Sequence, residues 1–76
     1  MKVIVYTTPA CPKCLNVKAL LKQHNVDFTE RNVFEDDEAR ERLMTEGIMS
    51  VPVVEINNEL MHDFTNDELL RALGLE

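Results

Sequence analysis

The chain has 76 residues, of which 45% are hydrophobic, and a formal net charge of −6 at pH 7. A chain of this length has room for one domain, residues 1–76, and the hydrophobic fraction argues against disorder. The acidic surplus argues against binding to nucleic acid or an anionic membrane, because phosphate contacts need clustered Lys and Arg. The apolar run at residues 3–6 is too short for a secretion signal or a membrane span. We therefore expect a cytoplasmic protein, and we also expect it to be monomeric.

Strand-like and helix-like patterns alternate along the chain. The predicted elements, in the order β-α-β-α-β-β-α, cover residues 3–6, 11–25, 26–33, 36–46, 53–56 and 59–62, and a last helix begins at the capping box Thr65-Asn66-Asp67-Glu68. The β-α-β start implies parallel strands with a right-handed crossover, and the two late strands form an antiparallel hairpin through Asn57-Asn58. The expected fold is α/β, with a four-stranded mixed sheet covered by three helices.

Several side chains are expected inside this fold. The predicted inward face of the first helix carries Cys14, Val17, Leu20, Leu21 and His24. Met44, Met49 and Met61 are typical gap-filling hydrophobes, and Tyr6 is expected in the core. These predictions place all of these residues in the packed interior.

The two cysteines occur together, in Cys11-Pro12-Lys13-Cys14, where the first strand gives way to the first helix. The loop between them is too small to hold a fold together, which indicates a chemical role. The helix N-terminus offers free N–H groups and a positive dipole end, Lys13 adds a charge, and Pro12 suits the first helical position. These features favour a thiolate at Cys11. We expect Cys11 to attack a disulfide and the more buried Cys14 to resolve the mixed disulfide.

A metal site is the alternative for the same cysteines. Zinc needs two further ligands, and the only candidates are His24 and His62. His24 lies several turns along the same helix, and His62 reaches the cysteines only by an accident of folding. An iron–sulfur cluster needs four thiolate-type ligands and therefore two chains. We expect no metal and no tightly bound cofactor, but a redox-active Cys11–Cys14 disulfide.

A second constellation is Ser50-Val51-Pro52. In one interpretation Pro52 simply opens a strand, where a missing N–H is tolerated. In the other, the Val51–Pro52 peptide bond is cis and turns the backbone of Val51 toward the cysteines. Only about 5–6% of X–Pro bonds in folded proteins are cis. The residues alone leave both interpretations open.

Together the two motifs resemble a known family. Residues 5–14, VYTTPACPKC, followed by residues 50–54, SVPVV, are similar to glutaredoxins and the related NrdH-redoxins of the thioredoxin fold. The resemblance covers essentially the whole chain. It implies that Cys11 matches the nucleophile of the family, Cys14 its resolving cysteine and Pro52 its cis-proline. It also implies that Val51 offers its backbone N–H and C=O to an extended substrate, in the manner of an added strand.

Several residues depart from the glutaredoxin pattern. Thr8 stands where glutaredoxins usually carry a Lys that meets a glutathione carboxylate, and Ser50 replaces their Thr before Val-Pro. Their Gly-Gly pair falls at Asp63-Phe64, where a negative charge and a ring should hinder an anionic tripeptide.

The departures at Asp63-Phe64 can be set against the NrdH-redoxin pattern Ser-Gly-Phe-x-x-Asp. Phe64 and Asp67 match its Phe and Asp, whereas His62 and Asp63 match neither of its first two residues. Phe64 is equally well explained as a core residue under the last helix. Asp67 is equally well explained as part of a helix N-terminus.

The leading prediction is a thiol–disulfide oxidoreductase that reduces protein disulfides and is recycled by a thioredoxin reductase, with ribonucleotide reductase as a candidate acceptor. One alternative is a glutaredoxin that uses glutathione as co-substrate. An alternative of another class is a module that binds a metal or an iron–sulfur cluster through Cys11. Beside the two cysteines, the predicted substrate-binding residues are Thr8, Pro12, Lys13, Ser50, Val51, Pro52, Asp63 and Phe64.

Overall fold

The computed structural model describes residues 2–75. Its elements are β1 (Val3–Thr7), α1 (Pro12–Gln23), β2 (Thr29–Asn32), α2 (Asp37–Thr45), β3 (Val53–Ile56), β4 (Glu59–Met61) and α3 (Asn66–Ala72). The predicted order of strands and helices is therefore confirmed. Within the described residues, no helix has both the length and the apolar character needed to cross a membrane.

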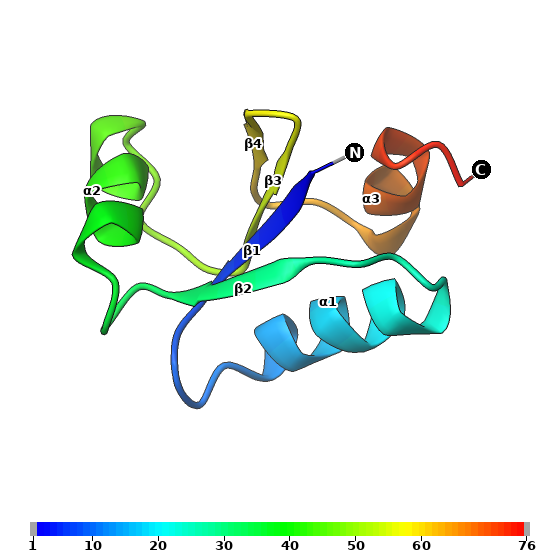
Figure 1. The fold of residues 1–76 in the computed structure, drawn as a ribbon, viewed down its shortest axis with the longest axis horizontal. Helices are drawn as coiled ribbons and strands as arrows, with labels where there is room; N and C mark the ends of the chain where they lie inside the picture. Colours follow the sequence, from blue (N-terminus) through cyan, green and yellow to red (C-terminus); the bar gives the residue numbers. More distant parts are fainter. Residues whose placement is uncertain (1, 76) are drawn as a thin grey trace.

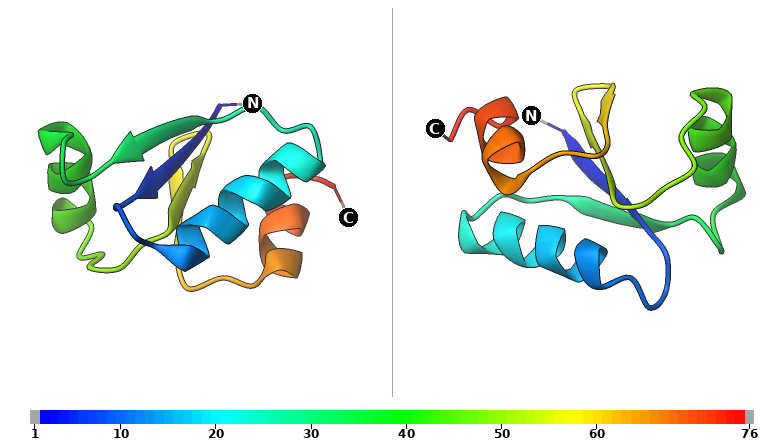
Figure 2. Two further views of the ribbon diagram at one scale, coloured as in Figure 1. Left: turned by 90° about the horizontal axis from the view of Figure 1, so that it is seen from below. Right: turned by 180° about the vertical axis from the view of Figure 1, so that it is seen from behind.

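The four strands form one mixed sheet in the order β2-β1-β3-β4. β1 pairs in parallel with β2 and antiparallel with β3, and β3 pairs antiparallel with β4. Helix α2 covers one face of this sheet, while α1 and α3 cover the other (Figures 1 and 2). This arrangement is the thioredoxin-like, glutaredoxin-type fold that the sequence predicts.

The sheet separates two hydrophobic clusters, because successive residues of a strand point to opposite faces. On the side of α1 and α3, the cluster contains Val3, Val5, Val17, Leu21, Val54, Ile56, Leu69 and Leu73. On the side of α2, it contains Ile4, Tyr6, Val33, Ala39, Leu43, Ile48 and Val53. Every residue of β1 is buried, which explains why residues 3–6 are continuously apolar instead of alternating.

Local signals in the sequence define where α2, α3 and the hairpin begin. Asp36 caps α2 by accepting a hydrogen bond from the backbone N–H of Ala39. Thr65 and Glu68 form the predicted capping box at the start of α3. Asn57 and Asn58 adopt φ values of 50° and 74°, which Asn tolerates better than most residues, in the turn between β3 and β4.

The segment between α1 and β2 differs from the prediction. Asn25 adopts a φ of 57°, so α1 ends at Gln23 and His24 becomes its exposed C-cap instead of an inward residue. Val26 donates its backbone N–H to the carbonyl of Leu21 and packs against the cluster on the α1 side. The predicted strand over 26–33 is therefore shorter, because its first residues close the end of α1 and do not pair with β1.

Two of the three methionines that the sequence predicts in the interior are exposed, so the prediction is wrong for Met44 and Met49. Met61 is half-buried against the cluster on the α1 side, as expected for a gap-filling residue. Met44 is 68% exposed and Met49 is 97% exposed. Ala39 and Leu43 face the sheet from α2, and Met44 lies beside this inward face rather than on it.

A polar contact crosses the cluster on the α2 side. The buried Tyr6 hydroxyl on β1 donates a hydrogen bond to the carboxylate of Glu55 on β3, which is 5% exposed. The guanidinium of Arg42 on α2 lies 3.6 Å from the same carboxylate. A buried carboxylate needs such partners, so this contact ties α2 to the sheet.

The environment of Tyr6 leads to a pH prediction. Burial first, and then the hydrogen bond to Glu55 and the negative charge of Glu55, raise the pKa of Tyr6 above its usual 10.0. The folded state therefore holds the phenolic proton more tightly than the unfolded state does. This tighter binding of the proton stabilises the folded state to its full extent below pH 10.0. The stabilisation is lost as the pH rises through the pKa of Tyr6 in the folded protein.

The sequence contains one Tyr and no Trp, so the ultraviolet absorbance of phenolate reports Tyr6 alone. We expect its titration midpoint above pH 10.0 in the folded protein and near pH 10.0 in denaturant. The variant Tyr6→Phe should show no such transition. A folded protein whose phenolate forms at or below pH 10.0 would contradict the buried hydrogen bond.

Candidate active site

Cys11 and Cys14 form a disulfide at the point where β1 leads into α1. Their Cα atoms lie 5.2 Å apart. Cys11 is the N-cap of α1, and its Sγ accepts a hydrogen bond of 3.1 Å from the backbone N–H of Cys14. Pro12 occupies the first turn, where the helix has no partner for an N–H. The fold thus aims a free helix N–H at the sulfur of Cys11.

The two sulfurs lie in different surroundings. Cys14 is 2% exposed and belongs to the buried face of α1, whereas Cys11 is partly exposed. No acidic residue lies in the first turn of α1, and the exposed Lys13 does. When the disulfide is reduced, the helix N-terminus and Lys13 therefore favour a negative charge on Cys11.

The loop before Cys11 carries a backbone feature that the sequence did not reveal. Ala10 adopts a φ of 59°, in the left-handed region that is unfavourable for a residue with a Cβ. Thr8 is half-buried in the same loop. The turn brings the chain from the end of β1 at Thr7 to the start of α1 at Pro12.

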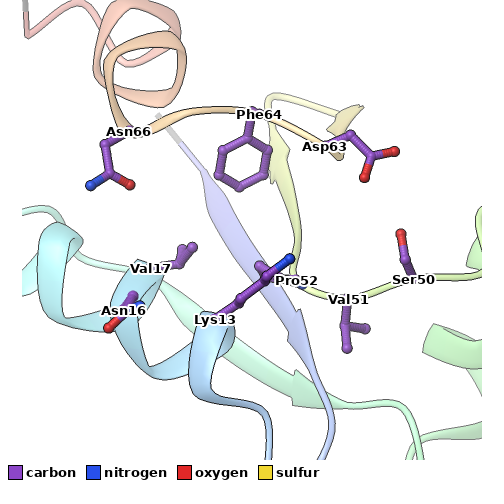
Figure 3. Close-up of a pocket in the computed structure, with 9 residues that line it drawn as sticks. All are labelled: Lys13, Asn16, Val17, Ser50, Val51, Pro52, Asp63, Phe64 and Asn66. Carbon is purple, nitrogen blue, oxygen red and sulfur yellow. The ribbon is translucent and has the colours of Figure 1, made fainter.

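The Val51–Pro52 peptide bond is cis, as the resemblance implied. A pocket beside it, which we call the cis-proline pocket, brings together six of the predicted site residues: Lys13, Ser50, Val51, Pro52, Asp63 and Phe64. Asn16, Val17 and Asn66 also line it, and the sequence analysis did not predict them as site residues. Figure 3 shows the pocket between α1, the segment before β3 and the segment between β4 and α3.

The remaining predicted site residues, Thr8, Cys11, Pro12 and Cys14, line a second cavity, which is bordered by the loop that joins β1 to α1 (residues 8–11, the active loop). Lys13 lies between Cys11 and Cys14 in sequence and lines the cis-proline pocket. The first turn of α1 therefore contributes side chains to both the cis-proline pocket and the second cavity. Both cysteines line the second cavity, at the N-terminus of α1.

Phe64 fits both explanations that its sequence context left open. Its ring points into the cis-proline pocket toward Pro52 (Figure 3). The same residue is half-buried and packs against the cluster on the α1 side. Asp67 lies in the first turn of α3 and does not line the pocket, which agrees with its explanation as a helix N-terminal residue.

Asp63 stands next to Phe64 and brings a negative charge to the pocket. Its φ is 55°, a conformation that Gly adopts without penalty and Asp tolerates. Its carboxylate is exposed and lies 3.0 Å from Nδ1 of the exposed His62. Lys13, on the opposite wall, supplies the positive charge of the pocket.

An apolar groove begins where the cis-proline pocket ends. It shares Ser50 and Val51 with that pocket and Thr8 with the active loop. Its other lining residues are Val33, Phe34, Arg40, Leu43, Met44, Ile48 and Met49. Phe34 is 69% exposed, and Met44 and Met49 are also exposed. The sequence offered one signal for this groove, since Met49 directly precedes Ser50-Val51-Pro52.

Within residues 2–75, no three His, Cys, Asp or Glu side chains are grouped so that they could hold a metal ion. His24 is exposed at the end of α1, and His62 pairs with Asp63. Neither histidine therefore joins the cysteines.

The glutaredoxin family model matches residues 3–61 of the chain. The chain belongs to the glutaredoxin family. With its cysteine pair at disulfide-bonding distance in this fold, it is a glutaredoxin-type thiol–disulfide oxidoreductase. A glutaredoxin-like 8.6 kDa protein encoded in a rubredoxin operon of Clostridium pasteurianum is 36% identical over 66 residues, which cover 86% of this chain and 88% of that protein.

Two solved structures are similar to the chain over most of its length. A variant of the thioredoxin-like protein BC3987 has 38% identity and a TM-score of 0.90, covering 99% of this chain and 97% of the other. The NrdH-redoxin of Escherichia coli, described as glutaredoxin-like with a thioredoxin-like activity profile, has 30% identity and a TM-score of 0.85 over 93% of both chains.

Part of the glutaredoxin-type chain also resembles a longer regulator. The global transcriptional regulator Spx 1 of Oceanobacillus iheyensis is 47% identical over 49 residues, which cover 58% of this chain but only 37% of that protein.

Proposed function

We propose that this glutaredoxin-family protein is an NrdH-redoxin-like electron donor, which reduces protein disulfides and is recycled by a thioredoxin reductase. The observation that carries the proposal is that Asp63 and Phe64 line the same pocket as Val51 and Pro52. In the glutaredoxin pattern two glycines at this place let glutathione approach. Here the ring of Phe64 and the carboxylate of Asp63 stand in place of those glycines, and the carboxylate repels an anionic tripeptide.

In the proposed reaction, the Cys11 thiolate attacks one sulfur of a substrate disulfide. The substrate disulfide breaks, its other sulfur leaves as a thiolate that takes up a proton, and Cys11 forms a mixed disulfide with the substrate. Cys14 then loses its proton and attacks the Sγ of Cys11. The Cys11–Cys14 disulfide forms, the second substrate thiolate leaves, and two electrons have passed from the protein to the substrate.

The geometry supports this division of roles. The partly exposed Cys11 can meet a substrate, and its sulfur accepts the N–H of Cys14 at 3.1 Å. Cys14 is buried, and the short Cα–Cα distance of 5.2 Å allows it to attack Cys11 without a change of backbone. In the mixed disulfide, Cys14 is thus held beside its target.

The cis-proline pocket would hold the substrate during the attack. The backbone of Val51 would bind an extended segment of substrate by strand addition, next to Pro52. Thr8, Pro12, Lys13 and Ser50 would flank this segment around the cysteines. Lys13 and Asp63 offer opposite charges to it.

The apolar groove supports a protein as the substrate. It continues from Val51 along the surface of α2, with Phe34, Met44 and Met49 exposed. A protein bound at Val51 can cover these side chains, whereas a tripeptide is too small to do so. Ribonucleotide reductase is the acceptor that the likeness to the Escherichia coli NrdH-redoxin suggests. We place this activity in a cytoplasmic, monomeric, single-domain protein.

The proposal is tested by offering the oxidised protein two electron sources. We expect rapid oxidation of NADPH with thioredoxin reductase and a protein disulfide, and slow oxidation with glutathione and glutathione reductase. The difference should be about tenfold or more, because both charge and shape of the pocket disfavour glutathione. Faster turnover with glutathione would instead identify a glutathione-dependent glutaredoxin. The variant Cys11→Ser serves as the blank in both assays.

A further inference from the structure

The second cavity, which the active loop borders, contains an ion pair that the proposed mechanism does not use. Its lining includes both cysteines together with Lys18 and Glu30. Glu30 accepts hydrogen bonds from Nζ of Lys18 at 3.0 Å and from Oγ1 of Thr7 at 2.8 Å. Thr7 is 1% exposed, so one of these donors is fixed inside the fold.

Lys18 and Glu30 are the only charged residues that line this cavity within the described part of the chain. Lys18 follows Cys14 by four residues on α1, which places the two side chains on neighbouring turns of one helix face. Glu30 approaches from β2. Of the other nearby charges, Lys13 faces the cis-proline pocket, and Lys22 lies one turn beyond Lys18 and acts on Glu30.

Glu30 is poorly suited to accept a proton from Cys14. The hydrogen bond from Lys18, followed by that from Thr7, lowers the pKa of Glu30 below its usual 4.5. A cysteine thiol has a pKa of about 8.5, so transfer of its proton to this carboxylate is unfavourable by about 10⁴-fold or more. Any effect of Glu30 on the cysteines is therefore an effect of its charge.

We propose that Glu30 is a positioning residue that sets the reduction potential of the Cys11–Cys14 pair by holding Lys18 and balancing its charge. A positive charge beside the cysteines stabilises a thiolate and so favours the reduced protein, while a negative charge has the opposite effect. Because the two charges lie 3.0 Å apart, their opposite effects on the stability of a thiolate largely cancel, and only the difference between these effects acts on the cysteines. The inference rests on the proposed redox function, but it does not depend on which reductase supplies the electrons.

The proposal predicts opposite effects for two substitutions. In Glu30→Gln the ammonium of Lys18 is left unbalanced, so the equilibrium with a dithiol should shift toward the reduced protein, by about three- to tenfold. In Lys18→Met the carboxylate of Glu30 is left unbalanced, and the shift should be of similar size toward the disulfide. The double variant Lys18→Met/Glu30→Gln should return close to the unsubstituted protein, because neither charge remains.

The measurement uses the whole chain in mixtures of reduced and oxidised dithiothreitol. In this exchange the two protein thiols lose two electrons and two protons, which reduce the dithiothreitol disulfide to two thiols. Alkylation of the free thiols gives the reduced fraction at each ratio. Ultraviolet absorbance of the thiolate, recorded against pH, should show a lower thiol pKa in Glu30→Gln and a higher one in Lys18→Met.

Two exposed charges outside the cavity, Lys2 and Glu46, provide matched controls. Lys2→Met and Glu46→Gln remove the same charges, and their equilibria should stay within about twofold of the unsubstituted protein. Shifts of the same sign in Glu30→Gln and Lys18→Met, or shifts no larger than those of the controls, would overturn the inference. Failure of the unsubstituted protein to exchange with dithiothreitol at all would overturn the proposed redox function and this inference with it.

Discussion

Replacing Cys11 with Ser should lower disulfide reduction by about three orders of magnitude or more, because the attacking sulfur is lost. The hydroxyl of Ser is not ionised at neutral pH, so the helix N–H that Cys14 donates to Cys11 would have no thiolate to stabilise. Cys14 cannot take over, since it is 2% exposed. Turnover of a protein disulfide by the reduced variant measures the loss.

The variant Cys14→Ser separates the two steps of the same reaction. Attack by Cys11 should proceed, but the mixed disulfide should persist because no second sulfur lies within reach. Intact-mass measurement after exposure to a small disulfide should therefore show one adduct in Cys14→Ser and none in Cys11→Ser. Adduct formation in Cys11→Ser would reverse the assigned roles. Thermal unfolding, monitored by circular dichroism, checks that both variants retain the fold.

Much of the fold was predictable because local signals and buried patterns agree. The continuously apolar residues of β1 reflect a strand covered on both faces. Thr65 and Glu68 specify the start of α3 through a capping box, and Asn57 and Asn58 specify the hairpin turn. Each of these signals depends on residues that are close in sequence.

The errors arose where tertiary structure decides between local options. Val26 has the character of a strand residue, but it closes the C-terminal end of α1 through the carbonyl of Leu21. Met49 is apolar, and only the completed fold shows that it is 97% exposed beside the active loop. Hydrophobicity alone cannot distinguish a core position from an exposed binding surface.

Part of the candidate site was also predictable from local signals in the sequence. The cysteine motif lies at the start of a helix, which the sequence indicates directly. The ion pair of Lys18 and Glu30 joins residues 12 positions apart on different elements, and no local pattern predicts it. No local pattern predicts the contact of Tyr6 with Glu55 either, because these residues lie 49 positions apart in the sequence.

The selectivity against glutathione should be reversible at Asp63 and Phe64. In the variant Asp63→Gly/Phe64→Gly, we expect reduction by glutathione to become about ten- to a hundredfold faster, while reduction by thioredoxin reductase gains nothing. Asp63 already has a φ of 55°, so glycine fits its backbone without strain. Removing the ring of Phe64 opens the wall of the cis-proline pocket that faces Pro52.

Charge and bulk can be separated by single substitutions. Phe64 is half-buried against the cluster on the α1 side, so its full truncation should lower the free energy of unfolding by about 1–3 kcal/mol, less than for a fully buried ring. Asp63→Asn leaves the core intact and removes only the charge, which should raise the glutathione rate by about fivefold. Asp67→Asn removes the same charge from α3 outside the pocket and should leave that rate unchanged. If the glutathione rate rises equally in both Asn variants, net charge governs selectivity and the pocket does not; if it rises only in Asp63→Asn, the carboxylate in the cis-proline pocket excludes glutathione.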